Sequence, residues 1–591
     1  MPETLEQTER SLTDTVATWL AQLTAAVKAE SSEMTADLFM PDGYWRDALA
    51  LTWQLQTIEG SQAIGRTLVE SARQVGLTSL EMATGLLAPV RVVRLGREVI
   101  EVGFRFETNT GRGRGVVRLV PDPANSHAWQ AWTLLTELDE LKEYEEAVHE
   151  RRPMGQANSR DFRGPNWLDK RVARQAYDDR DPTVLVVGGG QAGLSAAARL
   201  SHLNVDTLII DKHERVGDNW RKRYHALTLH NQVQVNHLPY MPFPPNWPAY
   251  IPKDKLANWF EAYVESLELN YWTGCELINA SFDETERHWL AELRLRDGST
   301  RTMRPTHIVM ATGVSGIPNR PELPGLDQFT GEVMHSSAYT DGEDWVGKRA
   351  IVIGTGNSAH DISQDLYSSG ASVTMVQRSP TLVVSIEPSA QLPYTLYNEG
   401  LPTEVCDLLV VGTPLPMVRR AHQHYTAQAK QLDESLLNGL TAVGFKLDFG
   451  EDNTGWQFKY LTRGGGYYFN VGCSDLLVDR KVKLVPFDQT AGFTASGLKT
   501  NNGETLEADL VVLATGYQPQ EVLVERLFGV DVRERVGPIW GYGDSLELRN
   551  MYCQTPQPGL WFIAGSLAQC RINSKYLALQ IKALEEGLID S

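Results

Sequence analysis

The sequence predicts an α/β protein in which an α+β domain precedes two Rossmann-like units. Two buried-strand patterns, at residues 183–187 and 348–353, are each followed directly by a glycine-rich turn and a helix-compatible segment. Ahead of them, a helical pattern is followed by several short segments rich in β-branched and aromatic residues, as in an α+β unit. The chain has 591 residues, enough for three or four domains of roughly 100 to 200 residues each.

Composition and charge exclude several classes of protein. Apolar residues make up 42% of the chain, and the 49 glycines bring it into the ordinary globular range, which excludes a wholly disordered or fibrous chain. The formal net charge of −19 argues against nucleic-acid binding by phosphate neutralisation. Five widely spaced cysteines predict neither a disulfide framework nor a metal site. Because the N-terminus is acidic and polar and no run of about 18 apolar residues occurs, we expect a cytoplasmic protein that is not bound to a membrane.

The N-terminal domain, residues 1–150, is predicted to begin with an amphipathic helix, whose apolar stripe at steps of three and four is Leu12, Val16, Trp19, Leu20, Leu23 and Val27. Strand-like segments follow at residues 49–58, 90–95, 99–106, 115–119 and 129–135. The fragment from Leu38 to Gly60, with this order of elements, resembles the nuclear transport factor 2-like (SnoaL-type) cone fold. Some relatives of that fold are isomerases, so Asp42 and Asp47 are candidate acid/base residues, although caps and ion pairs are the commoner use of such residues.

A connector follows this domain. Residues 138–152 are charged and favour a helix, and the polar stretch up to residue 180 contains Pro153, Gly155, Gly164 and Pro165. We therefore expect residues 151–180 to link the N-terminal domain to the first Rossmann-like unit.

The first glycine-rich turn has the pattern of a dinucleotide site. Gly188 permits a tight turn, Gly190 lets the backbone approach a pyrophosphate, and Gly193 lets the helix pack on the strand. A second buried strand ends at Asp211, 23 positions after Gly188, where an acidic residue accepts hydrogen bonds from a ribose hydroxyl. The residues predicted to bind this nucleotide are Gly188, Gly190, Gln191, Ala192, Gly193, Asp211 and Lys212.

The second glycine-rich turn repeats the pattern with an alanine in the third position. The strand after its helix ends at Gln377 and Arg378, where the first unit has an acid. A guanidinium suits a ribose 2′-phosphate, which an acid would repel, so this unit is predicted to bind NADPH and not NADH. A solvated surface arginine is the alternative for Arg378. The residues predicted to bind here are Gly354, Gly356, Asn357, Ser358, Ala359 and Arg378.

A longer motif lies between the two turns. Phe329, Gly331, His335 and Tyr339 have the spacing FxGxxxHxxxY, and on this motif the chain resembles the class B flavoprotein monooxygenases, that is, the flavin-containing and Baeyer-Villiger monooxygenases. The terminal Tyr339 is typical of the flavin-containing branch. With its N-terminal domain, the chain resembles the type II flavin-containing monooxygenases. Further residues that match the family's FAD and inter-domain segments are Gly217, Trp220, Ala514, Thr515, Gly516 and Gly565, with Asp218 standing where the family usually has a second glycine.

The resemblance implies a reaction and two cofactors. In that family NADPH reduces FAD, O₂ reacts at the flavin C4a, and one oxygen atom passes to a small organic substrate. The resemblance implies N- or S-oxygenation or Baeyer-Villiger oxidation. The segment 229–244 resembles the YUCCA-like monooxygenases, which leaves oxidative decarboxylation of a 2-oxo acid such as indole-3-pyruvate as an alternative. A disulfide reductase and a non-catalytic flavin-dependent sensor or scaffold are the other classes considered.

Two residues are the candidate catalytic residues. Family members place an asparagine near the flavin in the segment that here contains His230, Asn231 and Gln232, and Asn231 is the choice. For His335, support of the inter-domain linkage and of NADP⁺ placement is favoured over direct proton transfer.

The predicted division of the chain is 1–150, 151–180, 181–340 (FAD, first part), 341–505 (NADPH) and 506–591 (FAD, second part). Residues 381–470, rich in Tyr, Trp and Gly, are expected to cap the substrate side. Whether the enzyme is a homodimer is left open.

Overall fold

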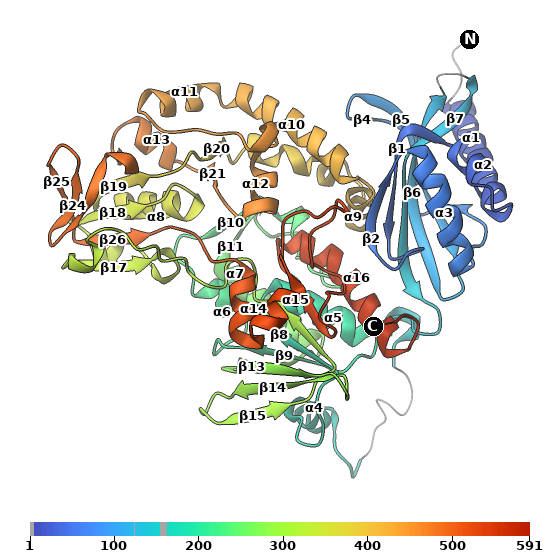
Figure 1. Ribbon diagram of the computed structural model, residues 1–591, viewed down its shortest axis with the longest axis horizontal. Helices are drawn as coiled ribbons and strands as arrows, with labels where there is room; N and C mark the ends of the chain where they lie inside the picture. Colours follow the sequence, from blue (N-terminus) through green and yellow to red (C-terminus); the bar gives the residue numbers. More distant parts are fainter. Residues whose placement is uncertain (1–4, 123–124, 154–161, 591) are drawn as a thin grey trace.

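The computed structural model describes residues 5–122, 125–153 and 162–590 (Figure 1). Its N-terminal domain lies at one end of the molecule and the two Rossmann-like units form the rest. Within the described ranges, no helix has the length and apolar character needed to cross a bilayer.

The N-terminal domain is a seven-stranded sheet with three helices on one face. The strand order is β2-β1-β7-β6-β5-β3, with β4 also paired to β5, and only β1 and β7 run parallel. The predicted stripe of the first helix is buried against the sheet. The elements are α1 (Leu5–Lys28), α2 (Ser32–Ala36), β1 (Phe39–Ala48), β2 (Leu55–Glu59), α3 (Ser61–Val75), β3 (Glu81–Met82), β4 (Val90–Arg94), β5 (Arg97–Glu107), β6 (Gly111–Asp122) and β7 (Asn125–Leu141).

Two local predictions in and after this domain are wrong, and two helical segments were not predicted. The strand expected at 49–58 is a hairpin, since β1 ends at Ala48 and Leu49, with a φ of 68°, starts the turn into β2. Residues 61–75 form α3, which the pattern did not predict. The helix expected at 138–152 is wrong, because residues 138–141 are the end of β7, where charged residues pair across strands (Arg112 with Glu140, for example), and the rest is turn with a short 3-10 helix at His149–Arg151. The connector itself contains a helix, α4 (Trp167–Ala176).

The first Rossmann-like unit is a five-stranded parallel sheet of order β12-β9-β8-β16-β27. Its continuous apolar strands are buried on both faces, and the last helix of the chain packs along α5. The elements are β8 (Val184–Val187), α5 (Gln191–His202), β9 (Thr207–Asp211), α6 (Asp218–Arg221), β10 (Thr228–Gln232), β11 (Tyr250–Pro252), α7 (Lys253–Ser266), β12 (Asn270–Thr273), β13 (Glu276–Asp283), β14 (His288–Arg294), β15 (Thr300–Met303), β16 (His307–Met310), α14 (Gln520–Phe528), α15 (Val530–Val536), β27 (Leu560–Phe562) and α16 (Leu567–Glu585).

The second Rossmann-like unit is a parallel sheet of order β17-β26-β18-β19-β22. The first two strands in this order lie outside the predicted boundaries of 341 and 505, because a strand of four residues carries no signal for which of two sheets it joins. The elements are β17 (Glu332–His335), β18 (Arg349–Ile353), α8 (Asn357–Ser368), β19 (Ser372–Gln377), α13 (Cys473–Val478), β22 (Lys483–Pro486), β23 (Thr490–Thr494), β24 (Gly497–Thr500), β25 (Thr505–Glu507) and β26 (Leu510–Leu513).

A mainly helical cap is inserted in the second unit and reaches from it to the N-terminal domain (Figure 1). One end of the cap is a small parallel pair of strands, β20 and β21. The other end packs on the N-terminal sheet, where Met417 of α10 shares a buried cluster with Val120 and Trp132. The elements are β20 (Leu382–Ser385), η7 (Ser389–Asn398), α9 (Thr403–Val411), α10 (Leu415–Leu432), α11 (Glu434–Ala442), α12 (Gly455–Arg463) and β21 (Tyr467–Asn470).

Candidate active site

The first glycine-rich turn is tightly constrained by the backbone around it. Gly188 has a φ of +109°, and a Cβ there would lie 2.6 Å from the Ala311 carbonyl oxygen. A Cβ at Gly193 would lie 1.9 Å from the Gly188 oxygen, so the helix start and the strand end touch. Gly190 differs, because its φ is −81° and an added Cβ would meet only the Asn219 amide, at 2.9 Å. The turn therefore leaves room in front of Gly190, at the N-terminus of α5, where an anion binds free N–H groups.

Asp211 ends β9 and closes the same turn. Its carboxylate accepts the Gly189 N–H at 2.7 Å and, on its other oxygen, the His213 N–H at 2.8 Å and Nδ1 at 2.7 Å. Burial alone would raise the pKa of Asp211, but these hydrogen bonds outweigh it and lower the pKa. The predicted ribose acid is thus held ionised beside the turn. Of its predicted neighbours, Ala192 is buried and Lys212 is exposed.

Gln191 brings three predicted residues together. Its amide nitrogen donates to the Gly565 carbonyl at 3.1 Å, and its amide oxygen accepts the Trp220 indole N–H at 3.3 Å. Gly217, just before Trp220, has a φ of +84°, and a Cβ there would lie 2.5 Å from the Ala257 oxygen. The glycine-rich turn, the segment at 217–220 and the start of α16 therefore meet at one place.

The start of α16 is itself a fixed structure. Ser566 is the N-cap, and its side chain and that of Gln569 form a reciprocal capping box with hydrogen bonds of 3.2 and 3.1 Å. The Tyr460 hydroxyl donates to the same Gln569 oxygen at 3.1 Å, which ties α12 of the helical cap to α16. Gly565 has a φ of +117°, the left-handed region that favours glycine.

The second glycine-rich turn repeats the geometry of the first. Gly354 has a φ of +124°, and a Cβ there would lie 2.3 Å from the Ala514 oxygen, which places the two segments in contact. A Cβ added to Gly356 would have only the Tyr467 carbonyl oxygen near it, at 3.9 Å. Asn357 accepts the Phe469 N–H through its side chain at 3.1 Å, Ser358 is half-buried and Ala359 is buried.

Gln377 and Arg378 separate at the end of β19. The Gln377 amide is buried and bonds to both the N–H and the carbonyl of Lys446, at 2.7 and 2.9 Å. Arg378 is exposed. Of the two residues, the arginine is therefore the one whose side chain faces solvent beside the turn.

The motif between the turns fastens strands of the second unit together. His335 is fully buried. Its Nδ1 accepts the Ser337 N–H at 3.1 Å, so the proton of the neutral ring is on Nε2, which donates to the Gly516 carbonyl at 3.0 Å. Burial lowers the pKa of His335. The Tyr339 hydroxyl donates to Asp365 of α8 at 2.6 Å, and the Thr515 hydroxyl donates to the Asn319 carbonyl at 2.6 Å. His335 thus holds the segment at 514–516 and is not among the residues that line the cavity described next.

A cavity of about 380 Å³ lies where the first unit meets the cap. One wall is formed by Gln191, Trp220 and the start of α16. The opposite wall is aromatic and comes from the cap, a contribution the sequence predicted only as a Tyr- and Trp-rich region. Its rings are Tyr394, Tyr397, Trp456, Tyr460 and Tyr467.

Asn231 supplies one of two side-chain oxygens that line the cavity and are unpaired, and the other belongs to Gln457 of the cap. The Asn231 side-chain oxygen is buried without a hydrogen-bond partner, whereas the Gln232 amide donates to Glu387 at 3.2 Å. His230 also lines the cavity, but its ring packs edge-on against Phe469 and burial lowers its pKa to about 4. Of the three candidates, Asn231 therefore has the free polar atom.

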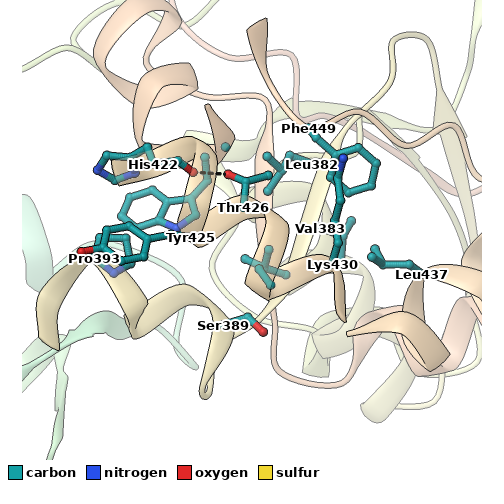
Figure 2. A pocket seen from close by; sticks show the side chains of 14 residues that line it. Leu382, Val383, Ser389, Pro393, His422, Tyr425, Thr426, Lys430, Leu437 and Phe449 are labelled. Carbon is teal, nitrogen blue, oxygen red and sulfur yellow. Dashed lines mark hydrogen bonds between the residues drawn. The ribbon is translucent and has the colours of Figure 1, made fainter. Parts of the chain in front are cut away.

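A second, smaller cavity adjoins the first, and Figure 2 shows the residues that line it. It measures about 20 Å³, room for about one water. The two cavities share Pro393 and Trp456 as a wall. The Ser389 hydroxyl is buried there without a partner, and Thr426 donates to the His422 carbonyl at 2.7 Å, the dashed line in Figure 2.

The cysteines do not form a redox pair. All five fall in the described ranges, each is free, and four are buried. Burial raises the pKa of Cys406 and of Cys553 to about 11, the opposite of an activated thiolate. The described cysteines therefore give no support to disulfide reductase chemistry.

Two Rossmann folds, each with a glycine-rich turn, and an aromatic cavity between the first fold and the cap are typical of an oxidoreductase that uses two dinucleotides. The family model described as pyridine nucleotide-disulphide oxidoreductase matches residues 185–399. The rice (Oryza sativa subsp. japonica) protein described as indole-3-pyruvate monooxygenase YUCCA1 is 30% identical over 356 residues, covering 59% of this chain and 80% of the relative. The probable indole-3-pyruvate monooxygenase YUCCA10 of Arabidopsis thaliana is 30% identical over 341 residues, covering 57% of this chain and 82% of the relative.

Solved structures share the fold. A cyclohexanone monooxygenase mutant from Rhodococcus sp. Phi1 bound to NADP⁺ has a TM-score of 0.51 and 18% identity, covering 69% of this chain and 87% of that chain. OTEMO in complex with FAD and NADP also has a TM-score of 0.51, at 15% identity, with the same coverage.

The chain belongs to the flavin monooxygenase family. It is an FAD- and NADPH-dependent monooxygenase that acts with O₂ on a small-molecule substrate, so the predicted class and both cofactors are confirmed. The sensor or scaffold alternative is not favoured.

The exposure of Arg378 leads to a test of nucleotide selection. A charge-assisted hydrogen bond contributes about 1.5 to 3 kcal/mol, so Arg378→Ala is expected to raise the KM for NADPH about tenfold or more and to leave the KM for NADH nearly unchanged. Steady-state kinetics with both nucleotides measure this. Lys499→Ala, which removes another exposed cation of the second unit, is the control. An equal effect of Arg378→Ala on both nucleotides would show that Arg378 does not contact the 2′-phosphate.

Proposed function

We propose that FAD is held by the first glycine-rich turn and Asp211, with its flavin part in the cavity among Trp220, Asn231 and the start of α16. The carrying observation is the convergence of Gln191, Trp220 and Gly565 on the wall of that cavity. The open space before Gly190 and the unpaired oxygen of Asn231 fit a group that is large, anionic at one end and polar at the other. NADPH would be held by the turn at 354–359 and by Arg378.

The chain's own residues then have separate tasks. Bound FAD, once reduced by NADPH, supplies the activation of O₂. The Asn231 amide provides a hydrogen-bonding group in the cavity, and the aromatic wall excludes water from it. His335, neutral and with both nitrogens bonded, holds the segment at 514–516 in place and acts as a positioning residue.

The walls of the cavity favour a neutral organic substrate. Among the described residues, all those that line it are uncharged, and most of the cap wall is aromatic. Such walls suit a thioether, an amine in its neutral form or a ketone, hence N- or S-oxygenation or Baeyer-Villiger oxidation. The names of the plant relatives keep oxidative decarboxylation of indole-3-pyruvate as the second candidate.

For the N-terminal domain we propose the nuclear transport factor 2-like (SnoaL-type) fold, supported by its helices packed on one face of a mainly antiparallel sheet. Its aspartates suit a structural role. Asp47 is buried and accepts hydrogen bonds from the backbone of Leu51 and Thr52 and from the Thr52 and Thr136 hydroxyls, which ties the β1–β2 turn to β7. Burial raises the pKa of Asp47 to about 6. Asp42 is exposed.

The test of this proposal is turnover by the purified full-length enzyme. With FAD, NADPH and O₂, we expect product from methyl phenyl sulfide, N,N-dimethylaniline or cyclohexanone, with NADPH consumed in step with product. Product analysis by mass spectrometry with labelled O₂ identifies the transferred atom. Turnover of indole-3-pyruvate to indole-3-acetate with none of the three neutral probes would establish the second candidate instead.

A further inference from the structure

The cap helix α9 lies beside the N-terminal sheet (Figure 1), and its residue Val410 lines the active-site cavity. Its buried side chains, Val405, Leu408 and Leu409 among them, belong to the same apolar core as the N-terminal strands. A Cβ added to Gly412, just after the helix, would be 3.5 Å from the Leu135 side chain of β7. The helix therefore rests directly on the sheet.

Two arginines of the N-terminal domain hold the C-terminal end of α9. Arg118, 3% exposed, donates to the Gly412 and Leu409 carbonyls at 3.0 and 3.4 Å and to the Thr413 hydroxyl at 3.3 Å. Arg46 donates to the Val411 carbonyl at 2.5 Å. The Leu409 and Val411 carbonyls lie in the last turn of α9 and Gly412 is its C-cap, and the Leu409 carbonyl also accepts the Thr413 hydroxyl at 2.8 Å. Carbonyls at this end form the negative end of the helix, so a guanidinium is the complementary group.

Both arginines are themselves fixed by carboxylates. Glu101 of β5 accepts from Arg118 at 2.7 Å, and Glu547, in the loop before β27, is bidentate to Arg46 at 2.7 and 2.8 Å. Burial would raise the pKa of Glu101, but Arg118 and Arg94 outweigh it and lower the pKa, so this carboxylate stays charged. Fixed charges on the sheet therefore set the position of the helix end.

The other side of α9 reaches the cavity. Val410 lines it directly. Asp407 accepts the hydroxyl of Tyr397, another lining residue, at 2.7 Å, and is bidentate to Arg571 at 2.8 and 2.7 Å. Arg571 of α16 also donates to the Val235 and His237 carbonyls at 2.8 Å each. A shift of α9 would therefore displace Tyr397 and Val410.

The N-terminal domain holds α16 as well. Glu137 of β7 accepts the Tyr576 hydroxyl at 2.8 Å, and Asp139 accepts the Lys575 ammonium at 2.6 Å. Both contacts lie on the helix whose first turn forms the flavin side of the cavity. The domain is thus bonded to helices on the two walls of the cavity.

We propose that the N-terminal domain is a clamp that sets the substrate side of the active site, with Arg118 as its positioning residue acting through α9, Asp407 and Tyr397. This rests on the proposed function of the cavity. The clamp fixes the distance between the aromatic wall and the flavin side, and so governs how a neutral substrate is placed, while reduction by NADPH at the second unit is independent of it.

The test compares Arg118→Ala with Arg118→Lys and with Leu23→Ala in the full-length holoenzyme. Leu23 is buried on α1, on the face of the sheet away from α9, so its variant weakens the same domain without touching the clamp. Misplacement of a substrate by about 1 Å can slow its reaction on the order of a hundredfold. In Arg118→Ala the KM for methyl phenyl sulfide is expected to rise about tenfold or more. The variant should also release more of the consumed O₂ as H₂O₂. Anaerobic flavin reduction by NADPH should stay within about twofold of wild type if the reductive site is independent of the clamp.

Arg118→Lys keeps a cation at the helix end and should recover part of the KM. Hydrogen exchange of the peptide spanning 397–411 should increase in Arg118→Ala more than in Leu23→Ala. If Arg118→Ala does not fold, Tyr397→Phe, which breaks the chain of contacts at its other end, should raise the KM while the unfolding temperature stays unchanged.

Equal changes of KM in Arg118→Ala and Leu23→Ala would overturn the clamp, as would a wild-type KM in Tyr397→Phe. A failure of the proposed function would give a different experimental result. In that case the wild-type enzyme would take electrons from NADPH and oxygenate no neutral probe, while the exchange difference at 397–411 would still report whether Arg118 holds α9.

Discussion

Gly190→Val is expected to give a folded protein that lacks FAD and has no oxygenase activity. The backbone at Gly190 has a φ of −81°, which valine adopts without strain, and an added Cβ meets only the tip of the Asn219 side chain. The fold therefore tolerates the substitution, but the valine side chain fills the space before the turn in which FAD is proposed to bind. Filling a packed space costs about 1 to 3 kcal/mol, so the affinity for FAD should fall by on the order of tenfold to a hundredfold and flavin should be lost during purification.

Gly356→Val is the matched control, because it makes the same change at the same position of the second turn. Its φ is −83°, and an added Cβ has its first neighbour at 3.9 Å. This variant should keep its FAD and lose fast reduction by NADPH. Flavin absorbance per protein, circular dichroism and anaerobic reduction measure the three properties. Full flavin occupancy in Gly190→Val, or loss of flavin in Gly356→Val, would contradict the assignment of the two turns.

Some features were predictable because their cause is local. Gly188 and Gly354 require left-handed backbone, and Asp211 follows the second buried strand at a fixed distance. Such constraints act within a few residues, so the printed sequence carries them. The sheet to which β17 and β26 belong depends instead on which strands lie beside them, and a strand of four residues suits either sheet.

The walls of the cavity were less predictable for a related reason. Tyr397 and Tyr460 come from a region without a motif. Asp407, ten positions away, accepts the Tyr397 hydroxyl, but the Tyr460 hydroxyl is accepted by Gln569, 109 positions away on the last helix. The contact of Arg118 with α9 joins residues almost 300 positions apart. In sequence, Arg118 is one charge in a strand, and its function depends on what docks against that strand.

The polar group in the cavity leads to the last prediction, that Asn231→Ala keeps FAD and its reduction by NADPH but loses coupled oxygenation. The main-chain carbonyl of Asn231 accepts the Asn236 amide at 2.9 Å, which fixes the end of β10 independently of the Asn231 side chain. That side chain is buried, and its oxygen has no protein partner. Loss of one preorganised hydrogen-bonding group in a water-poor site costs on the order of a hundredfold or more in rate. Product formed per NADPH should therefore fall strongly, with the remaining O₂ recovered as H₂O₂.

Gln232→Ala is the control for Asn231→Ala, because it removes a neighbouring amide that is already bonded to Glu387. Its coupling should stay near wild type, since no group that faces the cavity is lost. Stopped-flow reduction, H₂O₂ release and product yield separate the possible causes. Slow reduction in Asn231→Ala would assign the residue to nicotinamide placement, and loss of flavin would assign it to FAD binding. Unchanged coupling would mean that the free oxygen of Asn231 faces the cavity without a part in the reaction, and that the group stabilising the oxygenation step lies among His230, the cap tyrosines or the start of α16.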